Sequence, residues 1–202
     1  PLPNGNILMI AWDRKYATEA YAMGRESITN SLNEMWSESI LEIQPNIATG
    51  EAEVVWEWHL WDHLIQDSNA SLPGYGEISE HPELLDINWG TVGGGGGPGG
   101  ANADWRHHNA IDYNPIFDQI VISSRHGDEI MIIDHSTTTE EAESHEGGNS
   151  GMGGDFLYRW GNPQAYDRGD NSWHDLDSQH GVNWIPEGYP GAGDLILFNN
   201  GY

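Results

Sequence analysis

The chain has 202 residues, and its 32 acidic and 7 basic side chains give a formal net charge of −25. A surface this negative repels phosphate groups and anionic lipids, so the charge argues against nucleic-acid binding and membrane-surface binding, and favours solubility in a salty medium. The sequence contains no cysteine and no apolar run long enough to span a bilayer, which excludes disulfides, thiolate zinc sites and membrane insertion within the segment.

Apolar residues occur in short blocks bounded by Gly, Pro, Asn and Asp, a pattern typical of buried β-strands. In chain order these blocks lie at 7–10, 40–43, 54–56, 120–122, 130–133, 156–158 and 195–198. Only residues 60–67 and 78–87 suggest a short helix or helical turn, and Pro82 interrupts the second. The sequence therefore predicts an all-β fold.

The strands repeat in kind, since a tight turn precedes a buried strand near residues 4, 118 and 193. Repeated multi-strand units with recurring tryptophans are typical of the blades of a β-propeller. We expect about three blades with insertions, which is part of a six-bladed ring. The chain also begins without Met, so we expect it to be a segment of a longer protein, and its single incomplete propeller domain spans residues 1–202.

Two insertions separate these units. Residues 93–100 are seven glycines and one proline, which predicts a flexible spacer. Residues 136–154 are rich in Thr, Glu, Ser and Gly, which predicts a mobile acidic surface loop. The excess of carboxylates also raises the possibility of calcium binding, but no Asp-x-Asp-x-Asp-Gly loop is present.

The histidines are the main candidates for catalytic residues, because the chain has ten of them and only one lysine. Three groups stand at predicted strand ends, at 104–109, 123–126 and 179–184. No His-Glu-x-x-His or Gly-x-Ser-x-Gly sequence is present, so neither a zinc hydrolase nor a serine esterase is indicated. A metal held by histidines of several blades is one alternative. The favoured interpretation is a histidine nucleophile or base with Arg125 binding an anionic group, a combination suited to phosphoryl or sulfuryl transfer.

Several short motifs, in order along the chain, together resemble those of one known family. They are Trp-Glu-Trp-His at 56–59, Trp-Asp-His-Leu at 61–64, Asp-Trp-x-His-x-Asn at 104–109, Asp-x-Ile-Val-Ile-Ser-Ser-Arg-His at 118–126, Arg-Trp-Gly-Asn-Pro at 159–163, Gln-His at 179–180 and Gly-Asp-Leu-Ile-Leu-Phe-Asn-Asn-Gly at 193–201. With these motifs the chain resembles the bacterial arylsulfotransferase family, whose members transfer sulfate between phenols without a nucleotide sulfate donor.

The resemblance implies a six-bladed propeller with its site in the central channel and no cofactor. It implies that His180, which follows Gln179, is transiently sulfurylated, and that His107 and Arg125 hold the sulfuryl oxygens. Asn109, two residues after His107, belongs to the same motif and is expected to bind substrate. The partners implied are a small-molecule aryl sulfate donor and a phenolic acceptor, and the usual location of the family is periplasmic or extracellular.

Tryptophans are the candidates for holding the aryl ring, because an indole stacks well on an aromatic ring. Trp105 and Trp184 are the candidates, although blade packing is the favoured explanation for both of them. His108 occupies a variable position of its motif and is expected to be a bystander. A further catalytic histidine of the family, expected just before the segment that opens this chain, is absent. The alternative function is therefore a non-catalytic propeller that binds a ligand or protein.

Overall fold

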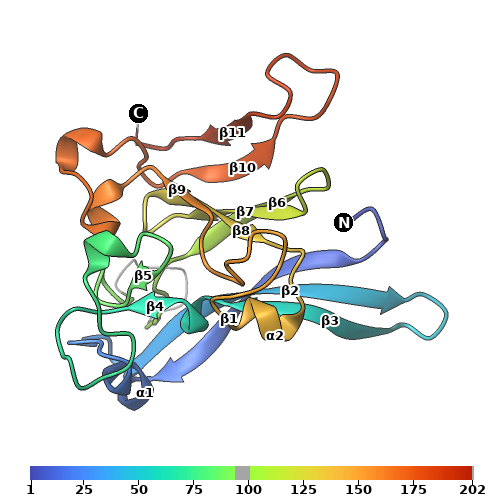
Figure 1. Ribbon diagram of the computed structural model, residues 1–202. Helices are drawn as coiled ribbons and strands as arrows, with labels where there is room; N and C mark the ends of the chain where they lie inside the picture. Colours follow the sequence, from blue (N-terminus) through green and yellow to red (C-terminus); the bar gives the residue numbers. More distant parts are fainter. Residues whose placement is uncertain (94–100, 202) are drawn as a thin grey trace.

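The computed structural model describes residues 1–93 and 101–201, and most of its regular secondary structure is β-strand (Figure 1). The predicted all-β class is confirmed. The glycine-rich spacer predicted at 93–100 lies, apart from Gly93, outside the described residues. Within the described part, no helix is long and apolar enough to cross a membrane.

The first sheet is an antiparallel meander of three long strands. β1 (Ile7–Tyr16) pairs with β2 (Glu34–Asn46), and β2 pairs with β3 (Glu51–His59). Helix α1 (Ala17–Ala22) follows β1 directly and was not predicted from the sequence. It has one and a half turns, too few for an apolar periodicity to be recognised.

Short elements connect this sheet to the next. A 3-10 turn, η1 (Leu60–Asp62), leads into β4 (Leu64–Ile65), and a second 3-10 turn, η2 (Ile78–Glu80), precedes β5 (Leu85–Asp86). β4 and β5 pair in parallel. The two predicted helical segments thus contain 3-10 turns, but each continues into a short buried strand.

The second sheet has four antiparallel strands in sequence order. They are β6 (His108–Asn114), β7 (Gln119–Ser124), β8 (Glu129–Asp134) and β9 (Tyr158–Trp160). All six residues of β8 and five of the six in β7 are buried, because both faces of this sheet are covered. That double burial explains why these strands are continuous apolar blocks in the sequence.

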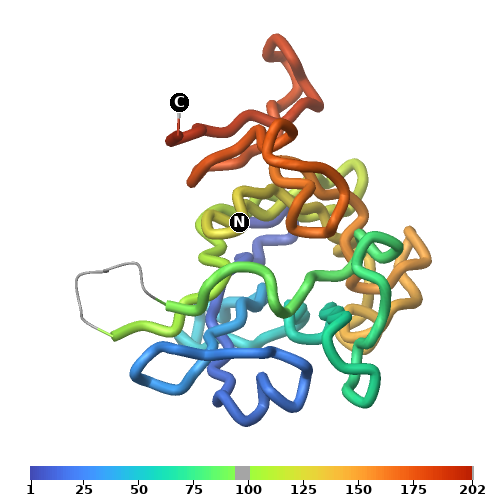
Figure 2. The backbone as a smooth tube through the Cα atoms, turned by 90° about the vertical axis from the view of Figure 1, so that its left-hand side faces the viewer, coloured from blue at the N-terminus to red at the C-terminus, as the bar shows by residue number. Residues whose placement is uncertain are grey.

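The last sheet is a two-stranded hairpin. The 3-10 turns η3 (Pro163–Tyr166) and η4 (Asn171–Trp173) lead to β10 (His180–Trp184), which pairs antiparallel with β11 (Leu195–Phe198). The three main sheets succeed one another across the molecule, with β10 beside β6, as Figures 1 and 2 show from perpendicular directions. None of the sheets is closed.

The main core lies between the first and second sheets, with a smaller cluster between the second and third. Fully buried members of the main core include Ile40, Trp58, Trp105, Ile120 and Met131. The smaller cluster contains Val121, Ile130, Leu176 and Val182. Together these clusters hold the ends of β6, β7 and β10 in fixed relation.

Some blocks predicted to be buried lie instead on exposed faces. Ile7 and Met9 of β1 are 43% and 44% exposed, and Ile196 and Phe198 of β11 are 57% and 67% exposed. The exposed side chains are alternate residues of each strand, so they share one face, which no other sheet of the described residues covers. The prediction of strands was correct here, but the prediction of their burial was wrong.

The segment 136–154, predicted to be a mobile loop, is folded against the first sheet. It contains helix α2 (Thr139–Ala142), which begins with a capping box between Thr138 and Glu141 and lies against β3. The indole N–H of Trp58 donates a hydrogen bond to the carbonyl of Gly154 at 2.7 Å. The polar composition suggested disorder, whereas these contacts with distant residues order the segment.

Candidate active site

Three of the predicted residues stand at one end of the second and third sheets. His107 immediately precedes β6, Arg125 immediately follows β7, and His180 is the first residue of β10. The Arg125 backbone N–H donates to the His107 carbonyl at 3.1 Å, so these two residues are direct neighbours. Antiparallel pairing of β6 with β7 produces this proximity, because the start of one strand meets the end of the other.

Hydrogen bonds from Gln179 and Asn109 attach β10 to the same end. The Asn109 amide donates to the Gln179 carbonyl at 2.7 Å. The Gln179 side chain is fully buried, and its amide donates to the carbonyls of Ser124 at 3.0 Å and Glu129 at 2.8 Å. Since His180 is the next residue, these bonds fix the position of its backbone at this end of the sheet.

His107 is held in an uncommon conformation. Its φ of 52° lies in the left-handed region, which costs a non-glycine residue on the order of 1 kcal/mol. Its Nδ1 forms a close hydrogen bond with the Asp104 carboxylate. Because an ionised carboxylate only accepts, Nδ1 carries a proton and Nε2 is left for another partner. Asp104 is buried and was not predicted as a site residue, although it opens the Asp-Trp-x-His motif.

His126 is a second residue whose position the sequence did not reveal. Its ring lies 5.0 Å from that of His107, centroid to centroid, and its Nδ1 lies 3.1 Å from the Trp105 carbonyl. The carbonyl only accepts, so Nδ1 carries the proton and Nε2 holds a lone pair. Burial lowers the pKa of His126, which favours the neutral ring near pH 7. The residue belongs to the Ser-Ser-Arg-His motif, which was the only available signal.

Arg125 is the one arginine whose guanidinium has no partner among the described residues. The others form hydrogen bonds or ion pairs; they are Arg14, Arg25, Arg106, Arg159 and Arg168. In a chain with 32 acidic side chains, a half-buried unpaired cation is unusual. Such a group offers a planar set of N–H donors to an incoming oxyanion.

His180 is oriented by the turn that precedes it. Its Nδ1 lies 2.9 Å from the Ser178 carbonyl, which also accepts a hydrogen bond from the Asn200 amide at 2.7 Å. The Asn200 nitrogen, which carries two protons, also lies 2.9 Å from the same Nδ1. Because the Ser178 carbonyl only accepts, its contact with Nδ1 is a hydrogen bond in the tautomer with the proton on Nδ1, and that tautomer has its lone pair on Nε2.

Comparison with known proteins identifies the family. The family model described as Arylsulfotransferase (ASST) matches residues 1–202, which is the whole chain. The chain belongs to the arylsulfotransferase family. Membership indicates aryl sulfotransferase activity, with a small-molecule aryl sulfate and a phenol as substrates. No curated protein and no solved structure matches the chain.

The two tryptophans predicted to hold the aryl ring lie elsewhere in this arylsulfotransferase chain. Trp105 is 1% exposed and belongs to the core, where its N–H donates to the Trp89 carbonyl at 3.0 Å. Trp184 ends β10, the opposite end from His180. The structure therefore brings together His107, Asn109, Arg125 and His180 but neither tryptophan.

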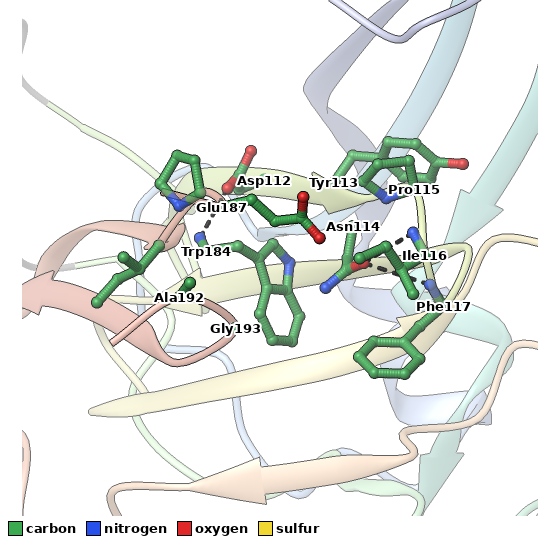
Figure 3. A pocket seen from close by; sticks show the side chains of 12 residues that line it. Asp112, Tyr113, Asn114, Pro115, Ile116, Phe117, Trp184, Glu187, Ala192 and Gly193 are labelled. Atoms are coloured by element: carbon green, nitrogen blue, oxygen red, sulfur yellow. Dashed lines mark hydrogen bonds between the residues drawn. The ribbon is translucent and has the colours of Figure 1, made fainter. Parts of the chain in front are cut away.

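Trp184 lines a pocket of about 680 Å³ (Figure 3). Its indole lies among side chains from the end of β6 and the following turn, with Ile116 and Phe117 on one side and Glu187 nearby. The Trp184 backbone N–H donates to the Asp112 carboxylate at 2.8 Å. This pocket contains none of the histidines of the candidate active site.

His108, expected to be a bystander, points into the interior. It is buried, and burial lowers its pKa to about 3, so the ring is neutral at physiological pH. Nearby, burial and the adjacent Asp104 carboxylate raise the pKa of Glu38 to about 8. The Glu38 carboxyl accepts the Arg106 backbone N–H at 3.1 Å, directly beneath the turn that carries His107. His108 and Glu38 are thus held mainly in their uncharged forms, near the buried ion pair of Arg106 with Glu129.

Two groups of side chains in the described residues have the spacing of metal ligands. In each group the ligand atoms of three residues lie within 4.8 Å of one another. One group is Asp104, His107 and His126 at the candidate active site. The other is His63, His145 and Asp155.

Proposed function

We propose that this protein transfers a sulfuryl group from an aryl sulfate to a phenol through a sulfo-histidine at His180, without a nucleotide sulfate donor. The observation that carries the proposal is the gathering of His107, an unpaired Arg125 and His180 at one end of the sheets. Family membership supplies the reaction class. The geometry supports the assignment of roles.

The transfer takes two balanced steps. In the first, the Nε2 lone pair of His180 attacks sulfur, an N–S bond forms, and the bond from sulfur to the aryl oxygen breaks to release a phenolate. In the second, the oxygen of the acceptor phenol attacks sulfur and the N–S bond breaks, which restores His180. Splitting the transfer in this way lowers each barrier, because neither step requires both phenols at once.

Arg125 and His107 stabilise the charge on the sulfuryl oxygens. Arg125 offers two parallel N–H donors, and no internal carboxylate among the described residues competes for them. Protonated His107, with Asp104 accepting from Nδ1, donates to an oxygen through Nε2–H. In the second step neutral His126 takes the proton of the acceptor phenol on Nε2, and it gives this proton to the phenolate released in the first step of the next turnover.

The architecture that we propose is a β-propeller in which the three main sheets are successive blades. Two observations support it. The sheets are antiparallel meanders that follow one another in chain order, with β10 beside β6. The exposed apolar residues of β1 and β11 provide surfaces on which neighbouring blades pack. In such a ring the end of the sheets that carries His107, Arg125 and His180 opens on the central channel.

The decisive experiment is intact-mass spectrometry after brief exposure to 4-nitrophenyl sulfate, quenched without acid because sulfo-histidine is acid-labile. The expected result is an adduct of one SO₃ group in the wild type and none in His180→Ala, with transfer reduced at least about 10³-fold. His81→Ala is the matched control, because His81 is an exposed histidine distant from the site.

An adduct that persists in His180→Ala would remove His180 as the nucleophile. Tight binding of 4-nitrophenyl sulfate with neither adduct nor nitrophenol release would overturn the proposed reaction and favour the alternative, a non-catalytic binding propeller.

A further inference from the structure

A second histidine cluster lies outside the candidate active site. His63 follows the 3-10 turn η1, and His145 and Asp155 belong to the folded segment after α2. The Asp155 Oδ1 atom lies 2.8 Å from Nδ1 of His63 and 2.8 Å from Nδ1 of His145. Two imidazoles therefore converge on one carboxylate oxygen.

The tautomer of His63 is determined by its other nitrogen. Nε2 lies 2.8 Å from the Ala142 carbonyl, which only accepts, so Nε2 carries a proton. A neutral His63 then directs the lone pair of Nδ1 at the Asp155 carboxylate, and two electron pairs that face each other repel. Either a second proton or a cation must lie between them.

The surroundings of His63 are those of a metal-ligating histidine. The side chain is fully buried and stacked parallel to the Trp58 indole, with centroids 5.5 Å apart. A histidine that binds a metal through one nitrogen commonly donates its other N–H to a backbone carbonyl, as His63 does to Ala142. The absence of a side chain at Gly154 is also required, because a Cβ there would lie 2.6 Å from Nε2 of His63.

From this geometry we infer that His63, His145 and Asp155 form a binding site for Zn²⁺. Two imidazole nitrogens and one carboxylate oxygen suit zinc rather than magnesium or calcium, which prefer oxygen ligands alone. The His145 side chain is 58% exposed, so the ion has an entry path and a solvent-facing fourth position.

The bound ion has a structural consequence. His63 lies directly after η1, whereas His145 and Asp155 lie in the segment 136–154 and just beyond it. A metal ion bound by all three residues links this segment to the turn that follows β3. Zinc binding therefore stabilises the folded form of a segment whose composition alone suggests disorder.

The test is a titration of the chelator-treated protein with Zn²⁺, followed by calorimetry and by thermal unfolding, and with Co²⁺, followed by visible absorption. We expect one Zn²⁺ bound at micromolar concentration, a rise in Tm that saturates and is reversed by EDTA, and the visible bands of tetrahedral Co²⁺. In His145→Gln and Asp155→Asn the affinity falls tenfold or more.

Two variants serve as controls. His81→Gln removes a histidine of similar exposure, 47%, that is also 2.8 Å from a carboxylate, and leaves zinc binding unchanged. His126→Gln alters the other candidate ligand group and likewise leaves this binding event in place. The inference is overturned if Zn²⁺ does not bind, which would mean that the cluster holds only protons. It is also overturned if the binding persists in His145→Gln or is lost in His126→Gln.

Discussion

Backbone carbonyls and one carboxylate select the reactive nitrogen of each histidine in the candidate active site. Nδ1 of His180 faces the Ser178 carbonyl, Nδ1 of His126 faces the Trp105 carbonyl, and Nδ1 of His107 faces Asp104. Every one of these partners accepts, so Nε2 is the free nitrogen in all three rings. A histidine in solution divides its proton between both nitrogens, whereas here the fold orients each ring for one task.

Replacement of the Asp104 carboxylate tests the role of His107. In Asp104→Asn the hydrogen bond to Nδ1 is retained without the negative charge that stabilises a protonated ring. We expect kcat to fall about 10²-fold or more, with a smaller change in KM. Steady-state kinetics across pH would measure both effects.

Asp112→Asn is the control, because Asp112 lies in β6 away from His107 and accepts a hydrogen bond from the Trp184 backbone N–H. Kinetics of Asp104→Asn that match the wild type at every pH would show that Asp104 does not position His107.

At the scale of elements, the start of β10 is anchored by one buried amide. Gln179 donates to carbonyls on two neighbouring strand ends, those of Ser124 and Glu129, and to the Ser123 hydroxyl. These hydrogen bonds fix the position of the start of β10 relative to the ends of β7 and β8. The position of His180 relative to Arg125 follows directly from this anchor.

Removal of the anchor is expected to affect stability and turnover together. Gln179→Ala leaves the Glu129 and Ser124 carbonyls without this donor, which costs about 1–3 kcal/mol of unfolding free energy. Urea denaturation would measure this loss, and kcat is expected to fall because His180 moves. Asn183→Ala, an exposed residue of the same strand, should change neither quantity. Equal losses in the two variants would contradict the anchoring role.

At the scale of the whole molecule, a buried polar network joins the first and second sheets. Glu38 of β2 accepts the Arg106 backbone N–H, and the Arg106 guanidinium reaches Glu129 of β8 at 3.3 Å. Glu129 also pairs with Arg159 of β9 at 2.9 Å. The two cationic side chains share one carboxylate, and a neutral Glu38 completes the network without adding a further buried negative charge.

The raised pKa of Glu38 predicts a dependence of stability on pH. Its pKa is about 8 in the folded protein and near 4.5 in the unfolded chain, so the folded state holds a proton that the unfolded state releases. This contribution to stability is complete below pH 4.5 and is lost as the pH rises through about 8. Glu38→Gln cannot titrate, so its Tm should decline less over this range.

Thermal unfolding of both proteins from pH 4.5 to 8 would show the difference. The pKa of His108 is lowered to about 3, so at lower pH its titration makes stability rise with pH, opposite to the effect of Glu38. Both proteins contain His108, so this contribution cancels in the comparison. Glu53→Gln, on the exposed part of β3, should retain the wild-type decline. Parallel curves for the wild type and Glu38→Gln would contradict the prediction.

Local patterns in the sequence were sufficient for the class of fold, and they named residues that the structure places at one end of the sheets. The strands were recognisable because apolar blocks and turn residues are properties of neighbours along the chain. Helix α1 was missed because it is too short for such a pattern, and the burial of β1 was wrong because burial depends on which sheets are neighbours. His107, Arg125 and His180 were predicted from motifs, each of which is contiguous in the sequence.

The tertiary structure alone decided which side chains meet. His63 and Asp155 are 92 residues apart, and the pairing of His126 with His107 depends on the register between β6 and β7. The same is true of Arg125, whose lack of a partner among the described residues appears only when their carboxylates have been placed. Contacts of this kind depend on the packing of whole sheets, and a linear pattern of residue types does not contain that information.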